Sequence, residues 1–169
     1  MPSLSKKLEV ISIMPYVGIT EDEFRNIIPI GEIQRYEGNC WAAALSMVLR
    51  CHDFDFNQNY VTSLLREWRI EGVTSKQMSD LVEYFNRNFL SKKNWIMKTT
   101  DSWQRILQYI GQFAPIQVFI TGHFVVMIGY DDSNDQITYF DPWDGSVLEV
   151  SKSKFARLGG GETVYMYKE

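Results

Sequence analysis

Cys40, His123 and Asp141 are residues whose types could together perform nucleophilic catalysis. In such a set a thiolate attacks a carbonyl carbon, an imidazole within hydrogen-bonding reach takes the thiol proton, and a carboxylate orients the imidazole. Gln34 could add a further function, because its side-chain amide and the Cys40 backbone N–H could both donate to the oxyanion of a tetrahedral intermediate. The set therefore predicts acyl-transfer chemistry.

Cys40 follows Asn39 and precedes a run of good helix formers. Asn39 is a suitable N-cap, which places Cys40 in the first turn of an expected helix at 40–50. Unpaired N–H groups and the helix dipole favour negative charge there, and therefore the nucleophilic thiolate. On this segment alone, a buried structural cysteine is an equally good interpretation.

The chain has two histidines, His52 and His123, so few residues can serve as the base. His52 lies at the end of the helix that Cys40 begins, roughly 18 Å away along the axis at a rise of about 1.5 Å per residue. His123 is therefore the histidine that can partner Cys40. Taken alone, His123 would more often be a strand-edge histidine without a chemical task.

Asp141 comes close to His123 if segments 123–130 and 136–141 form a β-hairpin. With the five residues 131–135 as the loop, His123 and Asp141 share one face of the sheet as diagonal neighbours. The prediction depends on an odd-length loop, because a shift of one residue would place them on opposite faces.

Two alternatives concern the turn that follows this hairpin. Asp141 precedes Pro142, so it could simply initiate a turn. Asp144-Gly145 is expected to be a hairpin turn and not part of the site.

The order of these residues resembles the papain-like cysteine peptidases. The resemblance rests on Gln34 with five residues before Cys40-Trp41, on Gly122-His123 followed by an apolar strand, and on Asp141-Pro142. The most similar branch is the small bacterial one, which includes bacteriocin-leader peptidases and papain-like effector proteases. The resemblance covers about residues 34–145.

The resemblance implies a papain-like fold and hydrolysis of peptide bonds in a polypeptide substrate, without a cofactor. By position it implies an oxyanion donor, a nucleophile, a base and an orienting carboxylate at Gln34, Cys40, His123 and Asp141. Substrate contacts are expected from Trp41, Gly122 and Trp143. A metal is not expected, since Cys51-His52 supplies one cysteine and one histidine on diverging helix positions.

Three alternatives use the same residues. Gly38-Asn-Cys-Trp41 also looks like the transglutaminase element, although the small size and the Gln34 spacing disfavour that family. A cell-wall amidohydrolase would likewise combine an early cysteine with a later Gly-His strand. A catalytically idle domain that only binds peptides is disfavoured because all the catalytic residue types are intact.

The kind of secondary structure expected around these residues changes near Pro115, from helices before it to strands after it. Helices are expected at 40–50, 57–69, 74–88 and 101–113, besides a short one opened by Thr20 and ended by Pro29. The helix at 74–88 is expected to have its cap at Thr74 or Ser75. Strands are expected at 7–17, 116–121, 123–130, 136–141, 146–150 and 162–168. We expect one α+β domain over residues 1–169, with a helical amino-terminal half packed on an antiparallel sheet from the carboxy-terminal half.

The composition is that of an ordinary globular chain, with 45% apolar and 22% charged residues. A net charge of −4 argues against nucleic-acid binding, and no apolar run is long enough to span a membrane. With only two cysteines, a reducing compartment is expected. The protein is therefore predicted to be cytoplasmic, or exported without a cleavable signal peptide and delivered into a host cell.

Overall fold

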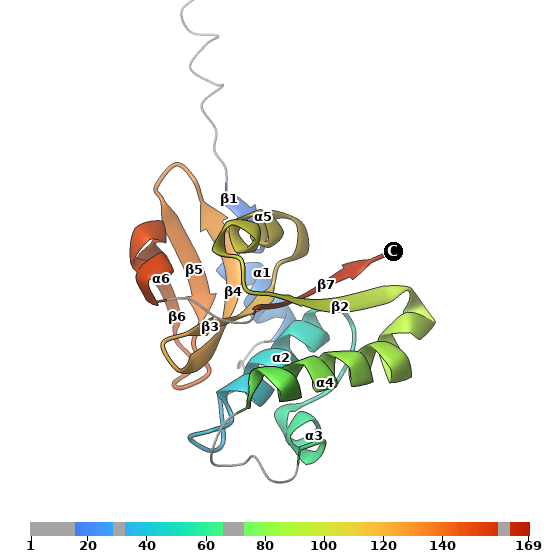
Figure 1. The fold of residues 1–169 in the computed structure, drawn as a ribbon. Helices are drawn as coiled ribbons and strands as arrows, with labels where there is room; N and C mark the ends of the chain where they lie inside the picture. The colour runs from blue at the N-terminus through green and yellow to red at the C-terminus, as the bar shows by residue number, and fades with distance from the viewer. Residues whose placement is uncertain (1–15, 29–32, 66–72, 159–162) are drawn as a thin grey trace, which may run out of the picture.

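A seven-stranded antiparallel sheet lies between two groups of helices (Figure 1). The computed structural model describes residues 16–28, 33–65, 73–158 and 163–169. The strand order is β2-β7-β3-β4-β5-β6, and β1 pairs with β4 off this path. The strands are β1 (Tyr16–Gly18), β2 (Trp95–Thr100), β3 (Ile116–Ile120), β4 (His123–Asp131), β5 (Gln136–Phe140), β6 (Val147–Ser151) and β7 (Thr163–Lys168). The α-helices are α1 (Glu21–Ile27), α2 (Cys40–Cys51), α3 (Gln58–Ser63), α4 (Ser75–Phe85), α5 (Trp103–Phe113) and α6 (Lys152–Leu158).

Helix α2 is the central element of the amino-terminal half. Its residues from Cys40 to Leu49 are all buried, and it packs against β4 and α3. A helix that is apolar on all sides belongs inside a fold. The three alanines at positions 42–44 favour the helix strongly and are small enough for close packing. Cys40 therefore stands at the head of an element that close packing holds in place.

Alternation along β4 divides its apolar side chains between two cores. Phe124 and Val126 belong to the core that contains α1, α2 and α4. Val125 and Met127 belong to the second core, which α5 and α6 close. In Figure 1, α5 and α6 accordingly lie away from α2 and α4, across the sheet.

The β4–β5 hairpin differs from the expected register at its loop. Asp131 pairs with Gln136, so the loop is formed by the four residues 132–135 and the expected loop of five was wrong. With the register continued unchanged from a loop of this length, His123 and Asp141 would lie on opposite faces of the sheet.

A β-bulge at Ile128 corrects this register. It leaves Ile128 without a partner between Met127 and Gly129, after which Val126 pairs with Phe140. These later pairs have the register expected from the sequence, because a bulge shifts the pairing by one residue. The imidazole and the carboxylate can therefore lie side by side because of the bulge and not because of the loop length.

Most of the expected helices are present, and their starts follow the predicted caps. The Thr20 hydroxyl accepts the Glu23 N–H, and Thr74 forms a reciprocal capping box with Gln77. Helix α4 ends at Phe85, earlier than expected, and continues as a π-helix and a 3-10 turn to position 93. Helix α3 is also shorter than predicted, since it ends at Ser63. Residues 66–72 lie outside the described residues, as do Pro29 and residues 7–15 of the strand expected at 7–17.

Two elements were not predicted. Strand β2 pairs along its whole length with β7, and the Asn86 side chain binds both backbone groups of Met97. Helix α6 has seven residues, which is too short for a clear apolar period. It forms because Phe155, fully buried, anchors it in the second core.

The bulge is supported from β1. The Ile19 N–H donates to the Ile128 carbonyl at 2.9 Å. Gly18 has a φ of +101°, and a Cβ there would lie 2.3 Å from the Ile128 oxygen. Glycine is therefore required where β1 crosses the bulge.

We expect Gly18→Ala to lower the free energy of unfolding by about 1–3 kcal/mol, because backbone must shift to admit the methyl group. Urea denaturation would measure this. Gly111→Ala is the control, since a Cβ there would meet Val17 at an ordinary 3.6 Å. Alanine in a helix should be neutral or stabilise by up to about 1 kcal/mol. Equal effects of both changes would contradict the role given to Gly18.

Candidate active site

Cys40 lies at the first position of α2, beside the start of β4. Asn39 is the N-cap as expected, but its backbone carbonyl accepts the first-turn N–H groups and its side chain makes no capping bond within the described structure. The Cys40 side chain is nearly buried, and its Sγ accepts the Phe124 backbone N–H at 3.4 Å. No sequence pattern identifies this donor, because it belongs to the backbone of a distant strand.

His123 is the first residue of β4. Its Nε2 lies 2.6 Å from Asp141 Oδ1, which leaves Nδ1 for the Cys40 thiol, the other group that raises the pKa of this ring. Burial lowers the pKa of His123, but the hydrogen bonds and charges of Cys40 and Asp141 outweigh burial and raise the pKa to about 9. The imidazole therefore carries a proton at neutral pH, beside the sulfur.

Asp141 is held at several groups at once. Its Oδ1 accepts the Trp143 N–H at 2.9 Å besides the bond to His123. Its backbone N–H donates to the Ser146 carbonyl, and its own carbonyl accepts the Gly145 N–H. One carboxylate oxygen of Asp141 thus makes both the bond of a turn initiator and the bond to the imidazole, so the turn does not prevent Asp141 from orienting His123.

Gln34 lies on the loop that leads to α2. Its backbone N–H donates to the Pro142 carbonyl at 2.8 Å, so the loop is tied to the turn that carries Asp141. Its side-chain Nε2 donates to the carbonyls of Tyr36 and Glu37, at 3.0 and 2.9 Å. Both amide hydrogens are therefore used within the loop. An oxyanion would have to replace one of these carbonyls.

Gln58, the first residue of α3, holds the same loop from inside the protein. Its buried side-chain amide donates to the Ile33 carbonyl at 2.7 Å and accepts the Arg35 N–H at 3.0 Å. These two groups flank Gln34 on either side. Gln58 was not among the predicted site residues, because its burial depends on the tertiary fold and not on its neighbours in the sequence.

The three residues expected to contact substrate lie in different surroundings. Trp41 has no exposed surface, so the expected contact was wrong, and Trp41 is a core residue of α2. Gly122 is exposed in the turn before His123, with a φ of +75°. Trp143 is 59% exposed. Gly122 and Trp143 remain available to a substrate.

Three other residues considered from the sequence make no side-chain hydrogen bond to Cys40, His123 or Asp141 in the described structure. The Asp144 carboxylate accepts the Ser146 N–H and hydroxyl within the turn, as a turn residue should. His52 packs on Trp95 at 4.6 Å, and burial lowers its pKa to about 4. Burial also raises the pKa of the Cys51 thiol to about 12. Across the described residues, no group of three or more His, Cys, Asp or Glu could hold a metal ion.

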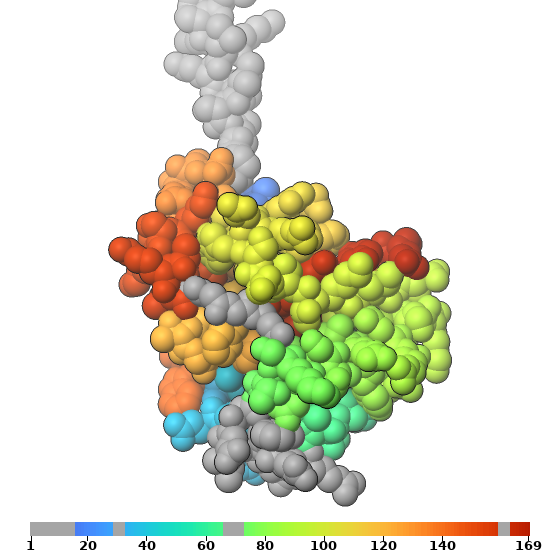
Figure 2. Space-filling model, viewed as in Figure 1, coloured from blue at the N-terminus to red at the C-terminus, as the bar shows by residue number. Residues whose placement is uncertain are grey.

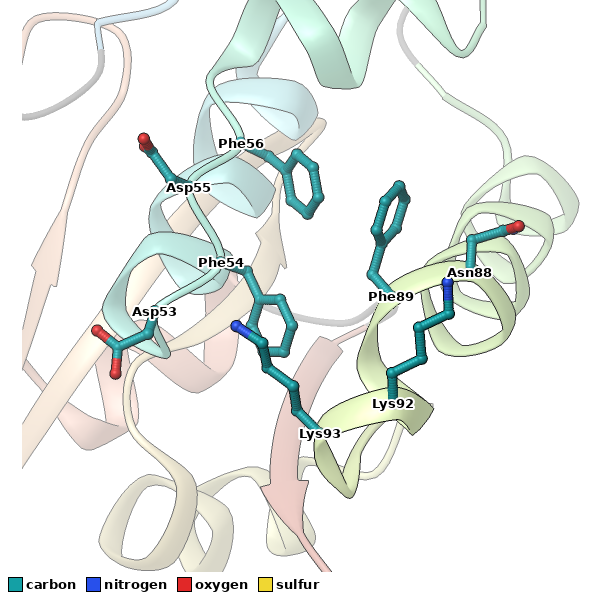
Figure 3. Close-up of a pocket in the computed structure, with 8 residues that line it drawn as sticks. All are labelled: Asp53, Phe54, Asp55, Phe56, Asn88, Phe89, Lys92 and Lys93. Carbon is teal, nitrogen blue, oxygen red and sulfur yellow. The ribbon is translucent and has the colours of Figure 1, made fainter.

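A shallow hollow of about 280 Å³ lies at the far end of α2 from Cys40 (Figure 3). Phe54, Phe56 and Phe89 line it, with Phe56 and Phe89 facing each other. Lys93 lies over the Phe54 ring at 5.1 Å. Its lining contains no cysteine or histidine, so the hollow is separate from the Cys40 cluster. Figure 2 shows the face of the molecule on which α4 and α5 lie.

No helix among the described segments has the length and apolar character needed to cross a membrane.

The chain resembles known proteins along most of its length. The model of the family described as "Peptidase_C39 like family" matches residues 25–161. A comparison with curated proteins gave no match.

Solved structures share the fold. The peptidase domain of Streptococcus ComA, a bifunctional ABC transporter of a quorum-sensing pathway, matches with a TM-score of 0.63 at 17% identity, over 82% of this chain and 97% of that one. A double glycine motif protease from an AMS/PCAT transporter, in complex with its leader peptide, gives 0.61 at 18% identity, over 81% and 89%. The peptidase C39 like domain of a Vibrio parahaemolyticus toxin secretion ATP-binding protein gives 0.53 at 7% identity, over 79% and 98%. These likenesses confirm the papain-like α+β fold.

The two histidines should give opposite pH dependences of stability. The pKa of His123 is raised to about 9. Its contribution to the free energy of unfolding is therefore complete below about pH 6.5 and is lost as the pH rises through 9. The pKa of His52 is lowered to about 4, so its contribution is complete above pH 6.5 and is lost as the pH falls through 4.

Urea denaturation of the wild type, His123→Gln and His52→Gln between pH 4 and pH 10 would measure these contributions. His123→Gln should flatten the loss of stability between pH 6.5 and 9, and His52→Gln should flatten only the loss below pH 6.5. Each variant serves as the control of the other. Identical pH profiles in the wild type and His123→Gln would contradict the assigned imidazolium.

Proposed function

The chain belongs to the Peptidase_C39-like family, and from this premise we propose that it is a cysteine peptidase that hydrolyses peptide bonds of a polypeptide substrate. The observation that carries the proposal is the 2.6 Å hydrogen bond between His123 and Asp141 beside Cys40, whose sulfur accepts the backbone N–H of the next residue, Phe124, at 3.4 Å. In this proposal Cys40 is the nucleophile, His123 is the acid and base, and Asp141 orients the imidazole.

The first half of the reaction forms a thioester. Because the His123 ring has already taken up the thiol proton and is an imidazolium, Cys40 begins the reaction as a thiolate, which the Phe124 N–H stabilises. The Cys40 sulfur attacks the carbonyl carbon, and one electron pair of the C=O bond moves to the oxygen. When the C–N bond breaks, His123 Nδ1 gives its proton to the leaving amine. The raised pKa of His123 supports this step, because the ring already holds the proton to be given.

The second half of the reaction releases the acid. Water attacks the thioester carbon and passes one proton to His123. The C–S bond then breaks, which releases the acid and restores the Cys40 thiolate beside the protonated His123. The Cys40 N–H, which has no partner inside the helix at this first position, donates to the oxyanion in both halves. Gln34 Nε2 is the second donor, and it does so by exchanging its bond with the Tyr36 or Glu37 carbonyl for one with the oxyanion.

A polypeptide substrate is supported by the surface around the cluster. Ile33, Tyr36 and Trp143 are large, exposed apolar side chains on the two loops that flank Gln34 and Asp141. Such a rim suits the side chains of an extended peptide. The double glycine motif protease was solved with a leader peptide bound, and we propose a peptide ligand of that general kind here. The three solved relatives are parts of transport or secretion systems, so delivery of this chain into a host cell as an effector has no support from them.

Activity should follow Cys40 and His123 and not the other thiol and imidazole. We expect Cys40→Ala to abolish cleavage of a broad peptide library and His123→Ala to lower kcat by about 10²–10⁴-fold. Cys51→Ser and His52→Ala are the matched controls and should retain turnover. A dead Cys51→Ser enzyme with an active Cys40→Ala enzyme would overturn the assignment. Amine incorporation into a glutamine peptide without hydrolysis would favour a transglutaminase instead.

Asp141 should matter less than the nucleophile or the base, because an orienting group acts only through the imidazole. We expect Asp141→Ala to lower kcat by less than His123→Ala does. Asp141→Asn should lower kcat less than Asp141→Ala, since an amide oxygen can still accept a hydrogen bond from the Nε2–H group. Steady-state kinetics on one cleaved peptide would measure this order. A larger loss in Asp141→Asn than in His123→Ala would contradict it.

A further inference from the structure

The turn that precedes His123 is tied to the end of a helix on the second core. Thr121 donates both its backbone N–H and its hydroxyl to the Leu158 carbonyl, each at 2.9 Å. Leu158 is the last residue of α6, where carbonyl groups have no partner inside the helix. One threonine therefore supplies both donors to a carbonyl that the helix leaves unpaired.

The conformation of this turn is unfavourable for threonine. Thr121 has a φ of +37° and Gly122 a φ of +75°, so both residues of the β3–β4 connection are in the left-handed region. Asn-Gly or Gly-Gly suits such a turn, whereas a β-branched residue is rare there. A residue persists in such a conformation only where surrounding interactions hold it, and such residues cluster at functional sites. The two bonds to Leu158 are those interactions.

Helix α6 touches the other arm of the site as well. Phe155 is fully buried, stacks on Trp103 at 5.4 Å and packs on Tyr139 at 5.5 Å. Tyr139 lies two residues before Asp141 on β5. The same short helix thus contacts the strand that leads into Asp141 and, through Thr121, the turn that leads into His123.

We propose that Thr121 is a positioning residue for His123, and that α6 is the brace against which it acts. The inference rests on the proposed function. It adds to the proposed catalytic residues one that acts through its bonds to Leu158 and not through a bond to Cys40 or Asp141. The two Leu158 bonds fix the turn, so that the imidazole stays within reach of Cys40 and Asp141 together. Misplacement by about 1 Å can cost about 10²-fold in rate, so loosening this turn should be visible in kcat.

The test uses Thr121→Ser, Thr121→Val and Thr121→Gly in the full chain. Thr121→Ser keeps the hydroxyl and should stay within about twofold of the wild-type kcat. Thr121→Val keeps the shape but loses the hydroxyl bond, and should lower kcat by about 10-fold or more with little change in KM. Thr121→Gly keeps the backbone bond and relieves the strain, so it should keep or raise the Tm while lowering kcat. Opposite movement of stability and activity is not expected of a purely structural residue.

A second measurement does not require peptide hydrolysis. The rate of Cys40 alkylation by iodoacetamide, followed against pH in the Cys51→Ser background, reports the pairing of the thiol with His123. Its pH profile should be that of the parent in Thr121→Ser and should shift in Thr121→Val and Thr121→Gly. The shift would uphold the positioning role even if no peptide were cleaved, so the failure of this inference and of the proposed function can be told apart.

Thr74→Val is the matched control, because it also removes one threonine hydroxyl bond, to the Gln77 N–H at the start of α4. It should lower the Tm while leaving kcat and the alkylation profile unchanged. Wild-type kcat and an unshifted alkylation profile in both Thr121→Val and Thr121→Gly would overturn the proposal. Loss of activity in Thr121→Val only in proportion to the unfolded fraction would overturn it too.

Discussion

The hydrogen bond between His123 Nε2 and Asp141 Oδ1 is the interaction on which the site depends. It commits one ring nitrogen to the carboxylate and leaves the other for Cys40. The carboxylate oxygen that accepts this bond also accepts the Trp143 N–H, so it cannot rotate away without breaking its own turn. A fixed acceptor gives a fixed imidazole, and this is what a thiol partner requires.

The arms of that bond come from strands whose pairing is not simple. The four-residue β4–β5 loop sets a register that a bulge at Ile128 then shifts by one residue. The bulge in turn lies beside β1, which pairs with β4 there, and Gly18 allows the close approach of the two backbones. A feature near one end of the hairpin thus decides which side chains meet near the other end. Bulges beside active sites re-aim side chains in this way.

The nucleophile and its partners belong to different parts of the fold. Cys40 begins a helix buried in the first core, whereas the strand residues of the same parity as His123 and Asp141 face the second. The groups meet where the head of α2 reaches the ends of β4 and β5. Each side is braced from its own core, α2 by close packing on all sides and the strand ends by α6. Helix α2 and strand β4, each packed in its place, meet at the hydrogen bond from the Phe124 N–H to Cys40 Sγ. This contact leaves little freedom to the reacting atoms.

The candidate catalytic residues, and the helices and strands that carry them, could be predicted from local sequence alone. The chain has two histidines, and one of them lies at the far end of the helix that Cys40 begins. His123 could therefore be predicted as the partner of Cys40 without coordinates. The helix that begins at Cys40, the caps at Thr20 and Thr74, and most of the carboxy-terminal strands depend on near neighbours, and local periodicity is sufficient to predict them.

The contacts that hold these residues in place could not be predicted, because they depend on the tertiary structure. The bulge at Ile128, the Gln58 bonds around Gln34, the burial of Trp41 and the Thr121–Leu158 contact all join residues far apart in the chain. Helix α6 and strand β2 were missed for the same reason, since each is stabilised by a distant partner and not by its own pattern. Periodicity and propensity describe a residue's neighbours in sequence, whereas these contacts are set by packing across the sheet.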